Sequence, residues 1–247
     1  MIPAGYLVGG AVAAATIAVG AVHPRSQIFG DTIRCTNSPQ KLAITFDDGP
    51  NPLITPSLLA LLEKYRVRAT FFMIGGFAAG CPNLVRDVAA AGHEIGNHTQ
   101  THPNLFWCSP QTIHGQIADC HASLSDVLGY RPKYFRPPYG FRNPWVVSAA
   151  SALGMQTVMW TLIPGDWREK TAEWLIRRIA PIEKRARYNF STLGYTGDVL
   201  CLHDGGHRAL NADRTHTLAA LAYWLPRWRD LGLEFVTISE AVGAPAH

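Results

Sequence analysis

Two adjacent carboxylates and two histidines four residues apart are the first side chains in this sequence that could do chemistry. Asp47 and Asp48 directly follow one short apolar run, and His98 and His102 follow another. Paired aspartates are electrostatically unfavourable unless a cation or an arginine compensates them. Histidines four residues apart meet on one face of a helical turn, where both can bind one metal ion. Asp48, His98 and His102 therefore form a candidate metal site with open positions for water and substrate.

Each half of this candidate metal site also has an ordinary explanation. Asp48-Gly49 is a common turn sequence, and one H-x-x-x-H spacing among 10 histidines arises easily by chance. The order of the two motifs at the ends of successive apolar runs favours the metal interpretation. Zinc is the default ion for these donors, and cobalt, nickel or iron fit the same set.

Further polar residues follow the later apolar runs. Arg136 precedes two prolines and Tyr139, and it could pair with whichever aspartate does not bind the metal; the alternative is a rigid surface turn. His203 ends another run, and Asp166 follows the run before it. An aspartate beside a histidine raises the pKa of the imidazole, as a general acid requires.

The elements that must position these residues alternate between short apolar runs and longer amphipathic ones. The predicted strands are Lys41–Phe46, Ala69–Ile74, Glu94–Asn97, Lys133–Arg136, Gln156–Trp160, Val199–His203 and Glu234–Ile238. The predicted helices begin at Thr55 as N-cap and at Ser109-Pro110, the latter ending at Leu128, and cover Pro82–Ala91, Pro144–Leu153, Thr171–Arg187 and Asp213–Leu231. This order predicts an α/β barrel or a doubly wound sheet, with the active site at the carboxyl ends of the strands.

Five motifs in order give the chain a resemblance to a known family. They are TFDDGP (45–50), HTQTH (98–102), RPPYG (136–140), DW (166–167) and LCLH ending at His203. The chain resembles the polysaccharide deacetylases of carbohydrate esterase family 4, the NodB-homology domain, from about Leu42 to Ser239. The resemblance implies a deformed (β/α) barrel of about seven parallel strands. It also implies removal of N-acetyl groups from N-acetylglucosamine units of peptidoglycan, chitin or a related glycan.

The resemblance implies that one aspartate acts as the base while the other binds the metal. Asp47 is similar to the general base of the family, and Arg136 to the residue that orients and tunes it. Asp48, His98 and His102 are similar to the ligands of one divalent ion.

A second group of matched residues would bind the substrate and protonate the leaving group. His203 is similar to the general acid, tuned by Asp166. Tyr139 would contribute its backbone N–H to an oxyanion hole. Trp167 and Leu202 would line the pocket for the acetyl methyl group.

One departure from the family pattern affects the substrate groove. Many members read D-x-x-D-W at the fourth motif, whereas the first aspartate position here is Ile163. Two alternatives to the N-deacetylase stay open: an O-acetyl esterase acting on xylan-like polymers, and an inactive membrane-tethered glycan-binding protein. A binding protein has no need of Asp47, Asp166 and His203 in addition to the metal ligands.

Composition and charge narrow the class of protein. The chain has 247 residues, 16% charged and 47% hydrophobic, with a formal net charge of +4 spread along the sequence. This composition excludes intrinsic disorder, and no basic stripe indicates nucleic acid as a partner.

The N-terminus differs from the rest. The uncharged stretch Ile2–Val22 could span ~30 Å as a helix. We therefore expect a hydrophobic helix as membrane anchor or export signal (1–22), a linker (23–40) and a catalytic domain (41–243), with the domain outside the cytoplasm. Arg25 and Arg34 follow the stretch and no cation precedes it, which is the reverse of the usual charge bias for that orientation.

The five cysteines leave their pairing open. Cys201 lies in an apolar run and is predicted to be a buried free thiol. Cys35, Cys81, Cys108 and Cys120 could form two bridges in an oxidising compartment.

Overall fold

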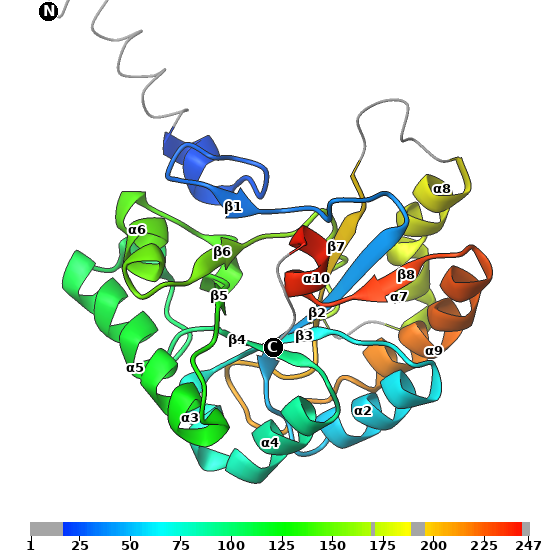
Figure 1. The fold of residues 1–247 in the computed structure, drawn as a ribbon, viewed down its shortest axis with the longest axis horizontal. Helices are drawn as coiled ribbons and strands as arrows, with labels where there is room; N and C mark the ends of the chain where they lie inside the picture. Colours follow the sequence, from blue (N-terminus) through cyan, green and yellow to red (C-terminus); the bar gives the residue numbers. More distant parts are fainter. Residues whose placement is uncertain (1–16, 169–170, 189–195, 244–247) are drawn as a thin grey trace, which may run out of the picture.

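Eight parallel strands form one curled sheet with helices on its outside (Figure 1). The computed structural model describes residues 17–168, 171–188 and 196–243. Its strands are β1 (Thr32–Ile33), β2 (Lys41–Gly49), β3 (Thr70–Met73), β4 (Glu94–Asn97), β5 (Tyr134–Phe135), β6 (Gln156–Val158), β7 (Asp198–His203) and β8 (Glu234–Val236). Their order is β1-β6-β5-β4-β3-β2-β7, and β8 pairs with the start of β2.

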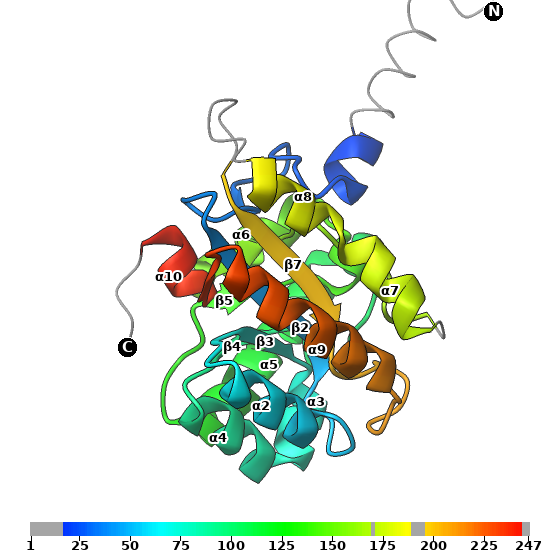
Figure 2. The ribbon, with the colours of Figure 1, turned by 90° about the vertical axis from the view of Figure 1, so that its right-hand side faces the viewer.

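Most helices cover the convex side of the sheet (Figure 1), whereas the last one packs against the inner core through Ile238 and Ala241. The helices are α2 (Thr55–Lys64), α3 (Gly75–Gly80), α4 (Pro82–Ala90), α5 (Pro110–Leu128), α6 (Pro144–Ala152), α7 (Ala172–Ile179), α8 (Pro181–Tyr188), α9 (Thr215–Asp230) and α10 (Ile238–Val242), with short 3₁₀ turns at Leu105–Trp107 and Pro138–Gly140. Figure 2 shows α7 and α9 side by side against β7.

The sheet is a deformed barrel, as the family resemblance implies, and not the doubly wound sheet that the order of elements also allowed. Beyond β6 the chain bridges to β7: Leu162 pairs with Leu200 in parallel, and the backbone N–H of Cys201 donates to the carbonyl of Leu162 at 2.9 Å. This contact brings the two ends of the sheet together on one side. The carboxyl ends of the strands therefore surround a common space.

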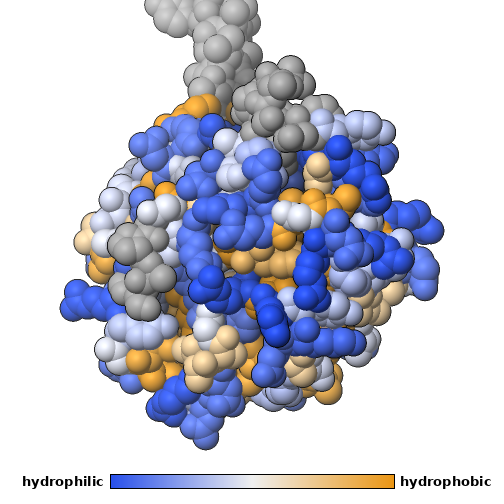
Figure 3. Space-filling model, turned by 45° about the vertical axis from the view of Figure 1, so that its right-hand side comes forward, coloured by the Kyte–Doolittle hydropathy of each residue, from blue (hydrophilic) through white to orange (hydrophobic). Residues whose placement is uncertain are grey.

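Alternation along the strands separates two cores. Leu42, Ile44 and Phe46 of β2 pack outward with Leu202 of β7 against the helices. Ala43 of β2 faces inward. Since successive side chains of a strand point to opposite faces, odd-numbered residues of both strands face the barrel interior. The surface in Figure 3 is mainly hydrophilic, with apolar residues in small areas between polar side chains.

The seven predicted strands are all present, and most predicted helices begin and end close to their expected residues. Ser109 caps α5 by accepting from the N–H of Thr112, and Gly129 ends that helix in the left-handed conformation. Two helix predictions are wrong. Thr55 is the first residue of α2 rather than its N-cap, because its hydroxyl donates to Asp204 and accepts from the Asn51 N–H.

The single helix expected over Thr171–Arg187 is two helices. α7 ends at Ile179 and α8 begins at Pro181. Proline has no N–H to donate to the preceding turn, so the helix breaks there.

The segment expected to be a linker belongs partly to the sheet. Thr32 and Ile33 form β1, which pairs with β6, and Met159 N–H donates to the Ile33 carbonyl at 2.6 Å. Two-residue strands carry too little periodicity to be found from sequence alone.

The expected N-terminal segment is described only over residues 17–22, which are helical; residues 2–16 lie outside the described residues. The fully buried Arg142 donates to the carbonyls of Gly20 and His23, and its N–H donates to the Ala21 carbonyl. Residues 20–23 therefore dock on the catalytic domain. No helix in the described ranges combines the length and the apolar character needed to cross a membrane.

All five cysteines have free thiols, so neither of the bridges considered for Cys35, Cys81, Cys108 and Cys120 is present. Cys201 is fully buried, as predicted.

Candidate active site

The residues picked out by their chemistry meet at the carboxyl ends of β2, β4 and β7 and in the loops that follow. Asp48 Oδ1 lies 3.1 Å from His102 Nε2 and 3.5 Å from His98 Nε2. One ligand atom from each of these buried residues lies within 4.8 Å of the others, which is the separation needed to hold one ion. The arrangement therefore brings together the predicted two-histidine, one-carboxylate set.

The histidines are not carried on a helical turn, so that expectation is wrong. Residues 98–102 form an irregular loop in which Thr99 and His102 have φ of 68° and 59°. Asp48 and Tyr139 also have positive φ, at 69° and 59°. Non-glycine residues rarely adopt this conformation, and it concentrates at functional sites, where packing holds the strained backbone in place.

The donor set fits a divalent cation. The buried Oδ1 of Asp48 and Nδ1 of His102 have no hydrogen-bond partner among the described residues. Burial raises the pKa of Asp48, but the close imidazoles of His102, His207 and His98 outweigh this effect and hold the pKa well below its usual value. His98 Nδ1 lies 2.8 Å from the Arg136 carbonyl, which turns its Nε2 toward Asp48. These residues are suited to bind a metal through one carboxylate and two neutral imidazoles.

Asp47 lies beside the ligand set, with its Oδ2 3.9 Å from His98 Nε2, and an arginine holds its other oxygen. Arg136 Nη1 donates to Asp47 Oδ1 and to Thr45 Oγ1, both at 2.7 Å, and the guanidinium is fully buried. The central guanidinium carbon of Arg136, Cζ, lies 4.2 Å from the ring centre of Phe72. The predicted pairing of Arg136 with the aspartate outside the metal set is confirmed.

His203 faces the same space from β7 and is paired with Asp166. Its Nδ1 lies 2.9 Å from Asp166 Oδ1, and its backbone N–H donates to Asp166 Oδ2 at 2.7 Å. Burial by itself lowers the pKa of His203, but the Asp166 carboxylate raises it to about 9, helped by Asp48 and Asp47. The imidazole is therefore protonated near neutral pH, with Nε2 free to donate.

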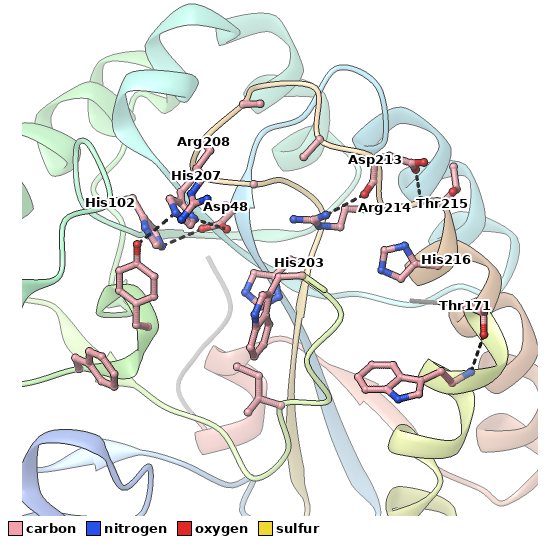
Figure 4. A pocket seen from close by; sticks show the side chains of 18 of the residues that line it. Asp48, His102, Thr171, His203, His207, Arg208, Asp213, Arg214, Thr215 and His216 are labelled. Carbon is pink, nitrogen blue, oxygen red and sulfur yellow. Dashed lines mark hydrogen bonds and ion pairs between the residues drawn. The ribbon is translucent and has the colours of Figure 1, made fainter. Parts of the chain in front are cut away.

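An open pocket of about 1360 Å³ connects these groups with solvent (Figure 4). Asp48, His102 and His203 lie at its inner wall, and Trp167 and Tyr139, 42% and 48% exposed, lie at its sides. The Trp167 ring meets the His203 ring edge-on, with centres 5.2 Å apart. Exposed aromatic faces beside polar groups are typical of ligand sites.

Leu202 does not lie where the sequence analysis expected it. It is fully buried in the core between sheet and helices and is not among the residues that line the pocket. Because side chains alternate along β7, the neighbour of His203 on the pocket side is Cys201. Its thiol lies 3.4 Å from Asp47 Oδ2, a contact that the apolar run gave no reason to expect.

His207 is a site residue that the sequence analysis missed. Its ring stacks on His102 with centres 4.4 Å apart, Nδ1 lies 3.8 Å from Asp48 Oδ2, and Nε2 lies 3.3 Å from the Tyr139 hydroxyl. A sequence signal for His207 was present, because it follows His203 by four residues, the same spacing that separates His98 and His102. Gly205 allows this loop to approach, since a Cβ there would overlap the Asp48 carbonyl.

Comparisons with known proteins agree with this geometry. Residues 34–158 match the pattern that defines the polysaccharide deacetylase family. The chain is 39% identical over 206 residues to a peptidoglycan-N-acetylglucosamine deacetylase of Bacillus cereus, covering 83% of this chain and 89% of that protein. It is 33% identical over 198 residues to a chitooligosaccharide deacetylase of Bradyrhizobium, covering 77% and 85%.

Solved structures give the same result. A crystal structure of a peptidoglycan N-acetylglucosamine deacetylase superposes with a TM-score of 0.74 at 29% identity, covering 87% of this chain and 93% of that one. A family 4 carbohydrate esterase from Streptomyces lividans in complex with acetate superposes with a TM-score of 0.69 at 29% sequence identity. The match covers 86% of this chain and 100% of that one. The fold and the site define a metal-site α/β-barrel hydrolase, and the chain belongs to the polysaccharide deacetylase family, as its motifs predicted.

Proposed function

We propose that the protein is a metal-dependent hydrolase that removes N-acetyl groups from N-acetylglucosamine units of a glycan. The observation that carries this proposal is that the metal ligands, the candidate base and the candidate acid are separate residues in one site. Asp48, His98 and His102 form one ligand set, while Asp47 and His203 lie beside it with opposite charge, each held by its own partner. A base and an acid on either side of a Lewis-acid site suit water attack on an amide.

A divalent ion bound by the ligand set would acidify a water molecule and polarise the acetamide carbonyl. Zinc is the ion we propose, from the nature of the donors. Asp47 then takes a proton from the water as the water oxygen attacks the carbonyl carbon. Arg136 fixes the orientation of Asp47 through the 2.7 Å contact.

Collapse of the tetrahedral adduct breaks the carbon–nitrogen bond. His203 donates its proton to the departing nitrogen, leaving acetate and a free amine on the sugar. Asp166 keeps His203 protonated for this step. We assign the backbone N–H of Tyr139 as a hydrogen-bond donor to the oxyanion. The Trp167 ring would form the pocket wall beside the acetyl group.

The same groups could cleave an O-acetyl ester, but the relatives favour the amide. The two relatives named above are a peptidoglycan-N-acetylglucosamine deacetylase and a chitooligosaccharide deacetylase. An inactive binding protein is disfavoured because the base, the acid and both of their partners are present. The fold by itself does not decide this point, since a pseudoenzyme at 23% identity also shares it, with a TM-score of 0.71.

We also propose that the N-terminal segment tethers the enzyme to a membrane or directs its export, with the catalytic domain outside the cytoplasm. The uncharged stretch Ile2–Val22 and a polymeric cell-wall-type substrate support this proposal. Fractionation of cells producing the full chain tests it: recovery only as soluble, unprocessed protein would exclude it.

Acetate release tests the proposed activity. The metal-loaded protein is assayed on chitooligosaccharides, peptidoglycan and acetylxylan, beside Asp47→Asn and His203→Gln variants. We expect release from the N-acetylated glycans, with both variants reduced by at least about 100-fold. Release from acetylxylan alone would establish the esterase instead.

A further inference from the structure

The pocket carries more positive charge than the proposed reaction uses. Arg177, Arg208 and Arg214 all line it, and among the described residues the lining carboxylates are Asp48 and Asp213. Asp48 belongs to the metal set, and a bound dication would more than neutralise it. The space beside the reacting groups is therefore cationic, although the acetamide itself is neutral.

Arg214 is the most unusual of the three arginines. It is only 9% exposed, yet no carboxylate oxygen among the described residues lies within 4 Å of its guanidinium. Nη1 donates to the Asp213 backbone carbonyl at 2.9 Å, and the buried Nε has no partner in the same described residues. Buried charges are normally paired because desolvation is costly.

The surroundings keep this guanidinium available to a ligand. In Figure 4 it points into the pocket from the start of α9. The Asp213 carboxylate is engaged elsewhere, accepting from the Thr215 N–H at 2.8 Å, and this bond holds the pKa of Asp213 below its usual value. A Cβ at Gly206 would lie 3.1 Å from Nη2 of Arg214, so the glycine leaves the guanidinium room.

We propose that Arg214, supported by Arg208 and Arg177, forms a subsite for a carboxylate carried by the substrate glycan. A guanidinium offers parallel N–H groups that match a carboxylate. The three arginines come from α7, from the loop after β7 and from the start of α9. A pocket of about 1360 Å³ exceeds what one N-acetyl sugar fills. Three arginines on three separate elements fit an acidic polymer better than free acetate, because one acetate ion would occupy a single arginine.

This inference rests on the proposed function, and a matched pair of substrates tests the two separately. One substrate is peptidoglycan glycan strands stripped of peptide, whose lactyl groups end in free carboxylates. The other is the same strands with those carboxylates converted to methyl amides. We expect the ratio of kcat/KM, acid form over amide form, to be well above one and to fall as salt is added.

Arg214→Gln should lower this ratio by about tenfold, mainly through KM, because a charge-assisted contact is lost. Arg214→Lys should restore part of it. The exposed Arg208→Gln should lower the ratio by about twofold without any risk to folding. Arg86→Gln, which removes an exposed charge on α4 outside the pocket, is the matched control and should leave the ratio as in the parent.

The outcomes separate the two proposals. Equal rates on the two forms, with the same ratio in Arg214→Gln, would overturn the carboxylate subsite while leaving the deacetylase intact. A change only in inhibition by added acetate would also overturn it, because Arg214 would then bind the product instead. No acetate release from either form would overturn the proposed function itself.

Discussion

The pair formed by His203 and Asp166 gives the sharpest quantitative prediction. The pKa of His203 is about 9, against an ordinary value of 6.5. Asp166→Asn removes the negative charge but keeps a group of similar size that can still accept from Nδ1. Burial is then opposed only by the smaller contributions of Asp48 and Asp47, so the pKa should fall toward its ordinary value of 6.5. At pH 8 the protonated fraction would fall from about 0.9 to about 0.03, roughly 30-fold.

The assay is the pH profile of kcat/KM for acetate release by metal-loaded enzyme. In Asp166→Asn the alkaline limb should move by about 2 pH units toward acid, with metal content unchanged. Asp126→Asn, which removes an exposed carboxylate on α5, is the control. A parent-like alkaline limb in Asp166→Asn would refute the assignment of His203 as the acid tuned by Asp166.

The same pair makes stability depend on pH. Because the folded pKa of His203 is raised above its unfolded value, its stabilisation is complete below about pH 6.5 and is lost as pH rises through about 9. The remaining predictions concern the metal and the N-terminus. Chelation should abolish acetate release, and added zinc or cobalt should restore it; full turnover by protein shown to be metal-free would contradict this. His207→Ala should weaken zinc binding about tenfold in a chelator competition, whereas His114→Ala, on the exposed face of α5, should not. Deleting residues 17–22 should cost about 2 kcal/mol because the buried Arg142 loses two of its carbonyl acceptors, those of Gly20 and Ala21, and Tm should fall by several degrees relative to a chain starting at residue 17.

The order of elements was predictable because buried parallel strands leave nearly continuous apolar runs. β2 is buried along almost its whole length, and the prolines at the starts of α4, α5 and α6 mark where those helices begin. β1 was missed because two residues carry no detectable period. The capping prediction at Thr55 failed because a long-range partner, Asp204, competes for its hydroxyl.

The identities of the site residues were predictable from the sequence, but their backbone conformations and the strand faces on which they lie were not. Motif order brought Asp48, His98 and His102 together, yet their positive φ angles and irregular loop depend on tertiary packing. Cys201 and Leu202 differ by one position on a strand, and only the register of β7 on β2 shows which faces Asp47. A one-residue error reverses the face on which a side chain lies.

Hydrolysis of an N-acetylglucosamine oligomer in water enriched in oxygen-18 tests the central claim most directly. We expect the metal-loaded enzyme to release acetate carrying one heavy oxygen and to leave one free amine for each acetyl group lost. We also expect that Asp47→Asn, with its metal still bound, forms neither product at a comparable rate. Unchanged oligomer under these conditions, or parent-like turnover by Asp47→Asn, would show that the site does not hydrolyse the N-acetyl group in this way.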